Sequence, residues 1–363
     1  MNDRSKNYPS LDVMKFIAAI LVIAIHTRPF YELNKLARTN GGGYNLICNI
    51  GVCLMDIAVP LFFLCTGYLL QEKIFISKSD EVGEILKTSL LKNIKFYIFW
   101  SIIYMPLAII GYLIAGDLIK QSIFDYVRNF LFRGEHYNSW PLWYLLAVIY
   151  AFLYLIMIKR MFLKNIFEYE ANKRKTFLVY SAFILLAYVV AALVTFFSDN
   201  YEQIGQPAFY LAVGLKGTFG NGRVFSGCYF ILIGMLMKTM NNSRGAYGIA
   251  FIFMGVVLRI LYFVPCAKDF GVICMSIGVF WLCTNIRLKQ RKIYLVTRNL
   301  SKWMYFLHMY VFSVISWVVF KEMRYGVGMF LAVAVVTVAV GIMIEKIAKG
   351  EGTVNNLFIV PKK

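Results

Sequence analysis

Apolar runs of about twenty residues recur along the whole of this 363-residue chain. An α-helix rises 1.5 Å per residue, so a run of that length crosses the hydrocarbon core of a bilayer. Hydrophobic residues make up 60% of the sequence and charged residues only 16%, which excludes an ordinary soluble domain. The sequence therefore predicts an all-α protein, a polytopic bundle of transmembrane helices in a cell membrane.

We expect about ten transmembrane helices, and the chain 1–363 as a single integral membrane domain with a core at about 10–348 and short tails. The first run contains Lys15 and His26 and lacks a small-residue cleavage site, which favours an uncleaved span over a signal peptide. The expected helices are roughly 10–28, 46–70, 94–115, 140–158, 176–197, 223–240, 246–264, 270–287, 303–320 and 326–346.

The net charge of +19 would suggest nucleic acid as a partner if the protein were soluble. Here the charges lie between the apolar runs, so the positive-inside rule is the better explanation, and we expect no nucleic acid. Alternate connections carry 25 Lys and Arg residues on one side and 11 on the other. This imbalance predicts that both termini are cytoplasmic. The seven cysteines show no metal-ligand spacing, so no metal site is predicted.

The first helix carries a cation and an imidazole on one face. Lys15 and His26 are eleven residues apart, which is three turns plus roughly 20°, and about 16 Å along the axis. A charged side chain in an apolar span normally faces a protein interior or a watery cavity. The functional interpretation is a polar path with Lys15 toward the inside and His26 toward the outside. Alternatively, both side chains reach the two interfaces and have no further role.

Other polar groups lie within the expected spans. Asp56 falls near the middle of the second helix, where Pro60 should kink the chain. Arg259 falls about two-thirds of the way outward in the seventh helix. His308 is expected near the inside, at the depth of Lys15. Several of these groups meeting at one cavity would define a site.

The connections between the spans also contain candidates. Lys92 and Lys95, at i and i+3, suit either topology signalling or a surface that binds a phosphorylated donor. The apolar spacing over 119–131 predicts an amphipathic helix on the outer leaflet, leading to Glu135 and His136. The glycine-rich connection 198–222 lacks the Walker spacing, and we expect a flexible or re-entrant loop there.

Four stretches in this order resemble the landmarks of the acyltransferase-3 family of membrane proteins. They are the basic residue and histidine of the first helix, VPLFFLCTGYLL at 59–70, PLWYL at 141–145 and YFLHMYVF at 305–312. Two positions depart from the pattern: Asp56 stands where a basic residue is expected, and Pro141 where many relatives have a histidine. Related membrane modules occur fused to a serine racemase in vancomycin resistance.

The resemblance implies transfer of an acyl group, usually acetyl, from cytoplasmic acetyl-CoA to a hydroxyl of an extracytoplasmic glycan or lipid-linked saccharide. By position, His26 would be the catalytic residue, Lys15 its basic partner, and Lys92 and Lys95 the donor-binding pair. Acyl-CoA would act as a substrate, with no bound cofactor.

Two other hypotheses stay open beside the enzyme. In a transporter of a small polar solute such as serine, Asp56, Arg259 and His26 would be substrate or proton sites. No inverted repeat or pair of broken helices is evident in the sequence to favour it. A catalytically inactive scaffold or partner subunit is the third hypothesis.

Overall fold

The computed structural model of the chain describes residues 8–31, 46–78, 81–116, 118–162, 173–240, 245–261 and 267–350. Within these ranges, all regular structure is helical. Nine of the described helical segments are long and apolar enough to cross a bilayer, and α11 (Gly245–Ile260) is a shorter apolar helix. The prediction of an all-α, multi-pass membrane protein is confirmed.

The contacts divide the chain into two compact units, residues 1–62 with 243–363 and residues 63–242, while the single domain expected from the sequence stays a prediction. The first unit contains α1 (Pro9–Thr27), α3 (Leu46–Asp56), the start of α4 (Ala58–Ile76), α11, α12 (Ala267–Asn285), α13 (Lys292–Val314), the π-helical turn η3 (Ile315–Phe320) and α14 (Val327–Gly350). The second contains the rest of α4, α5 (Val82–Ala115), α6 (Ile119–Phe132), α7 (Leu142–Phe162), α8 (Lys173–Asp199), α9 (Ala208–Phe219), η2 (Gly222–Phe225) and α10 (Ser226–Met240).

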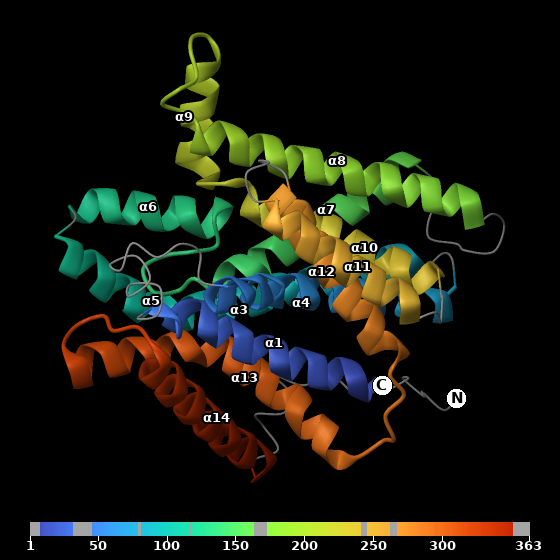
Figure 1. The fold of residues 1–363 in the computed structure, drawn as a ribbon. Coiled ribbons are helices and arrows are strands. Elements are labelled where there is room, and N and C mark those ends of the chain that lie inside the picture. Colours follow the sequence, from blue (N-terminus) through green and yellow to red (C-terminus); the bar gives the residue numbers. More distant parts are fainter. Residues whose placement is uncertain are drawn as a thin grey trace. The chain divides into compact units, whose positions relative to one another are not determined.

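In the first unit, α1 and α13 lie side by side (Figure 1). They run in the same direction, because Asp12 near the start of α1 contacts Arg298, while His26 near its end contacts His308 ten residues further along α13. Parallel helices in a membrane require an odd number of crossings between them. Counting α11 as a crossing satisfies this requirement for α1 and α13, so the direction of α13 supports the ten spans expected from the sequence.

The short helix α11 packs closely against α12 (Figure 1). A Cβ atom added at Gly278 would lie 2.6 Å from the carbonyl oxygen of Gly248, and one added at Gly255 would lie 2.8 Å from that of Gly271. Any side chain at these positions would separate the two backbones. The sixteen residues of α11 rise about 24 Å, a little less than the thickness of the hydrocarbon core.

The second expected span is interrupted rather than continuous. Helix α3 ends at Asp56 and α4 begins at Ala58, with Ile57 in a turn between them. The cause is Pro60, whose ring would clash with the carbonyl of Asp56 four residues earlier and which has no N–H to donate to it. The expectation of a kink near Pro60 is therefore confirmed, and Asp56 lies at a helix end instead of inside a helix.

Three expected boundaries are wrong. The connection expected over 71–95 is almost all helical, because α4 continues to Ile76 and α5 starts at Val82. Helix α13 starts at Lys292, not at 303. The flexible or re-entrant loop expected over 198–222 contains the helix α9. In each case the helix extends over charged or glycine-rich residues, which do not belong to an apolar run and were therefore expected to lie in a connection.

In the second unit, α7 packs against α5 and α10, and α10 against α8. Large aromatic side chains fill its interior, among them the fully buried Phe63, Trp100, Tyr104 and Tyr180. The amphipathic helix expected over 119–131 is present as α6, which has no buried residue. It is attached to α5 by the Tyr97 hydroxyl, which donates to the carbonyl of Phe130 at 2.6 Å.

Candidate functional site at the α1–α13 interface

An ionic cluster joins the first half of α1 to α13. The Arg298 guanidinium donates from Nε and Nη2 to the two carboxylate oxygens of Asp12, at 2.9 and 2.8 Å. Lys15, one turn further along α1, places Nζ 3.0 Å from Asp12 Oδ1. The Asp12 side chain is 3% exposed, whereas those of Lys15 and Arg298 are 19% and 30% exposed.

The cluster carries one net positive charge. A carboxylate buried in apolar surroundings is tolerated only when it is paired and hydrogen-bonded, and here two cations share it. Lys15 and Arg298 therefore share the single negative charge of Asp12. Lys15 was predicted from the sequence, whereas Asp12 and Arg298 were not. The i, i+3 spacing of Asp12 and Lys15 was the available signal for the first pair.

Two imidazoles lie against each other further along the same interface. The rings of His26 and His308 are stacked, with centroids 5.2 Å apart and an interplanar angle of 30°. His308 is completely buried and His26 is partly exposed. The expectation that His308 lies at the depth of Lys15 is wrong. Because α13 begins eleven residues earlier than expected, His308 is well inside the helix and level with His26.

The end of α1 that carries His26 is fixed by several contacts. The backbone N–H of Gly326 donates to the carbonyl oxygen of Thr27 at 3.0 Å. Arg28 ends the helix in the left-handed conformation, with φ of 47°, and its N–H donates to the carbonyl of Ala24 at 2.9 Å. The Arg28 guanidinium lies 4.8 Å from the centre of the Tyr325 ring. The last turn of α1 is therefore held against the residues that precede α14.

The remaining intramembrane pair of the first unit is Asp56 with Arg259. Arg259 Nη2 lies 2.8 Å from Asp56 Oδ2, and Nε lies 3.1 Å from the sulfur of Cys53. The Arg259 side chain is 8% exposed and that of Asp56 is 34% exposed. Of the five groups expected within the spans, Asp56 thus pairs with Arg259 and His26 with His308. Lys15, the fifth, belongs to the cluster with Asp12 and Arg298.

The expected donor-binding lysines belong to the second unit. Lys92 and Lys95 are both exposed on α5, one turn apart. Lys73, near the end of α4, is close enough to Lys92 for the two charges to repel each other. A third cation, which sequence analysis did not single out, therefore adds to the positive surface on which an anion would be favoured.

The connection between α6 and α7 holds the two remaining candidates. Glu135 forms an ion pair with Arg223, and the Arg223 guanidinium lies 4.6 Å from the centre of the Trp143 ring. His136 is 5% exposed and stacks on Tyr126, with centroids 4.1 Å apart. Burial lowers the pKa of His136 to about 4, so this imidazole is neutral at physiological pH. Glu135 and His136 therefore both make packing contacts in the connection between α6 and α7.

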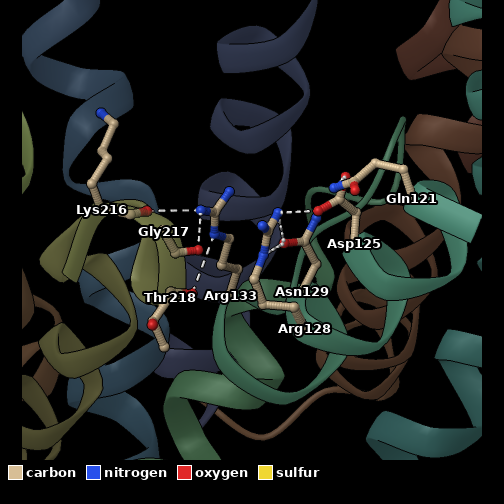
Figure 2. A network of polar contacts seen from close by, with 8 residues as sticks. All are labelled: Gln121, Asp125, Arg128, Asn129, Arg133, Lys216, Gly217 and Thr218. Carbon is tan, nitrogen blue, oxygen red and sulfur yellow. Dashed lines mark hydrogen bonds and ion pairs between the residues drawn. The ribbon is translucent and has the colours of Figure 1, made fainter. Parts of the chain in front are cut away.

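A second arginine ties this connection to α9. Figure 2 shows the Arg133 guanidinium facing the backbone carbonyls at the end of α9. Its Nη2 donates to Lys216 and Gly217 at 2.8 and 2.7 Å, and its Nε donates to Thr218 at 3.3 Å. The Lys216 carbonyl also accepts the N–H of Gly220 at 3.0 Å. Carbonyls in the last turn of a helix have few partners within it, so a cation there supplies donors and complements the helix dipole. Burial lowers the pKa of Arg133 without neutralising it.

Comparison with known proteins gives one family match that covers nearly the whole chain. The profile of a family described as an acyltransferase domain matches residues 8–346. No solved structure matches significantly.

The curated relatives are racemases from enterococci. An amino-acid racemase of Enterococcus faecalis is 25% identical over 302 residues, which are 79% of this chain and 37% of that protein. A serine/alanine racemase of Enterococcus gallinarum is 24% identical over 315 residues, 84% of this chain and 40% of that protein. The chain therefore spans less than half the length of these relatives.

Proposed function

Because the chain belongs to the acyltransferase-3 family, we propose that it moves an acyl group, acetyl in the first instance, from cytoplasmic acyl-CoA to a hydroxyl outside the cytoplasm. That the protein is a multi-pass membrane acyltransferase follows from the family match and the nine candidate spans. The acetyl-CoA donor, the glycan or lipid-linked saccharide acceptor, the orientation and the residue roles are our proposal.

One observation carries the proposal. A single helix interface presents a cationic cluster near its start and a pair of imidazoles further along. Lys15 and His26 are about 16 Å apart along α1, roughly half the thickness of the hydrocarbon core. A thioester donor made inside the cell and a hydroxyl acceptor outside it need such a path. The anionic part of the donor would bind at the cations, and its thioester would reach His26.

His26 suits the chemistry for two reasons. An imidazole takes up and releases protons near neutral pH more readily than a lysine or a carboxylate. The contacts of Thr27 with Gly326 and of Arg28 with Tyr325 fix the last turn of α1, so the backbone that carries His26 does not have to be ordered when substrate binds. His26 would act as the base for the acceptor hydroxyl or would carry the acyl group between donor and acceptor.

The basic residues would hold the phosphates of the donor. In the first unit, Lys15 and Arg298 lie together beside Asp12 and outnumber it in charge. In the second unit, Lys92 and Lys95, with Lys73 close to Lys92, supply an exposed positive surface on α5. Phosphate oxygens accept charge-assisted hydrogen bonds from such groups.

A second candidate function is supported by one observation. The break between α3 and α4 lies at Asp56, beside the buried guanidinium of Arg259. Interrupted helices with charged groups at their ends are typical of transporter binding sites. A small zwitterion such as serine carries charges complementary to this pair. The named racemase relatives act on amino acids, which is compatible with such a solute.

Reconstituted protein separates the two functions. Liposomes containing the protein receive acetyl-CoA labelled in the acetyl group on one side and envelope polysaccharide extracted from the expressing cells on the other. The proposal expects protein-dependent release of CoA and transfer of label to the polysaccharide. Uptake of labelled serine with no release of CoA would instead favour the transporter.

A further inference from the structure

His308 is the least explained polar group in the α1–α13 interface. It is completely buried, yet it lies in the stretch of α13 that faces the partly exposed ring of His26. Its Nδ1 lies 3.0 Å from the carbonyl oxygen of Met304, one turn earlier in the same helix. Among the described residues, its Nε2 has no hydrogen-bond partner.

These contacts determine which nitrogen carries the proton. A carbonyl oxygen only accepts hydrogen bonds, so Nδ1 of His308 must be the donor to Met304. A buried imidazole without a negative partner stays neutral, which leaves Nε2 with a lone pair. A buried acceptor without a donor costs about 1–3 kcal/mol, and such groups in a native structure need an explanation. The lone pair of Nε2 is therefore oriented and unused.

We propose that His308 is a second catalytic residue, whose Nε2 takes the proton of the acceptor hydroxyl while His26 carries the acyl group. This inference rests on the proposed function and divides its chemistry between two imidazoles. His26 is the more exposed ring and meets the thioester first. His308 is stacked against it, so a hydroxyl that attacks an acyl group on His26 approaches the ring that carries the free lone pair.

The two steps balance. In the first, a nitrogen of His26 attacks the thioester carbonyl, the carbon–sulfur bond breaks and CoA leaves as the thiolate. In the second, the acceptor oxygen forms a bond to the acyl carbon, the bond from that carbon to His26 breaks, and the hydroxyl proton goes to Nε2 of His308. The CoA thiolate takes up a proton from water, and His308 releases its proton to water, so both histidines return to their starting state.

Three variants test this division. His308→Asn keeps a side-chain N–H where Nδ1 donates to Met304 but has no atom at the position of Nε2. His308→Phe keeps a flat ring for the stack on His26 but has neither nitrogen. His308→Gln places an acceptor oxygen near the position of Nε2 and serves as the folded variant where the other two lose thermal stability. His26→Ala is measured beside them.

The assay follows labelled acetyl-CoA, with envelope polysaccharide as the hydroxyl acceptor. We expect the folded His308 variants to release about one CoA per protein, to retain the acetyl group on His26, and to lose at least 100-fold in turnover. Hydroxylamine, a nucleophile that needs no base, should discharge the retained acetyl group and restore turnover in these variants but not in His26→Ala.

Each other outcome has a definite meaning. Turnover of His308→Phe or His308→Asn within about threefold of wild type would overturn the role of Nε2 and leave His308 as a packing residue. A folded His308 variant that binds donor but releases no CoA would overturn the assignment of His308 to the second step. Full activity of His26→Ala would instead contradict the proposed function itself, so the two failures are distinguishable.

Discussion

The Arg298 guanidinium donates hydrogen bonds to both carboxylate oxygens of Asp12, at 2.9 and 2.8 Å. This contact joins the start of α1 to α13. The two residues are 286 positions apart in the sequence, and the contact sets the register of the two helices that carry the histidines. Because Lys15 contacts the same carboxylate, the candidate donor-binding cation is also positioned by this pair.

Asp12→Ala should destabilise the protein by roughly 3 kcal/mol, at the low end for a broken buried ion pair because both cations keep some water. Thermal unfolding in detergent measures the effect. Glu322→Gln is the matched control, since its pair with Arg324 is more than half exposed and should contribute less than about 1 kcal/mol. Equal midpoints for the two variants would show that the Asp12 cluster does not stabilise the interface.

Replacing Lys92 and Lys95 together by glutamine should weaken the binding of acetyl-CoA without lowering thermal stability, because both side chains are exposed. Isothermal titration at two salt concentrations measures the affinity and its salt dependence. The double variant of Lys289 and Lys292, which are also exposed and basic, controls for the loss of two charges. Similar affinities for the two double variants would show that Lys92 and Lys95 do not bind the donor and serve only to set the orientation of the protein in the membrane.

The orientation can be tested with single cysteines at exposed positions. Lys120 lies in α6, in a connection expected outside, and Lys289 lies between α12 and α13, in a connection expected inside. In intact cells, a membrane-impermeant maleimide should label Lys120→Cys and leave Lys289→Cys unlabelled until the cells are opened. The reverse pattern would exchange the donor and acceptor sides of the proposal.

The buried His136 predicts a specific loss of stability at low pH. Its pKa of about 4 in the folded protein is below the value of about 6.5 expected on unfolding. The unfolded chain therefore binds a proton first as pH falls from 6.5 toward 4, and folding loses about 2 kcal/mol at pH 5 from this residue. Between pH 7.5 and 5, the stability of wild type should fall by about 2 kcal/mol relative to that of His136→Phe, as measured by unfolding. A constant difference between them would contradict the burial argument.

The fold was largely predictable because each span is a continuous run of apolar residues that can be recognised without knowledge of the rest of the chain. Apolar runs identified the spans, and Pro60 predicted the irregularity that separates α3 from α4. The starts of helices were less predictable. Positive residues at the beginning of α13 look like a connection, so the helix was expected to start late and His308 was placed at the wrong depth. The helix α9 was missed because glycines at 214 and 217 suggested a loop.

Only the half of the site that lies on α1 was predictable from the sequence. The pair of Lys15 and His26 can be read from α1 alone, because both depend on helical periodicity. Arg298 and His308, their partners on α13, are distant in sequence, and no local pattern connects residues from two helices. Arg259 and Asp56 were each identified as intramembrane charges, but their pairing required the structure.

The most direct test of the account is transfer of labelled acetyl from acetyl-CoA by His26→Ala and His26→Gln in reconstituted membranes. Both variants should lose turnover while they keep expression, thermal stability and donor binding close to wild type, because glutamine retains hydrogen bonding but neither accepts a proton nor carries an acyl group. His136→Phe, a histidine of the second unit, should keep most of the activity. Turnover of His26→Ala near the wild-type rate would contradict the central claim that His26 performs the transfer.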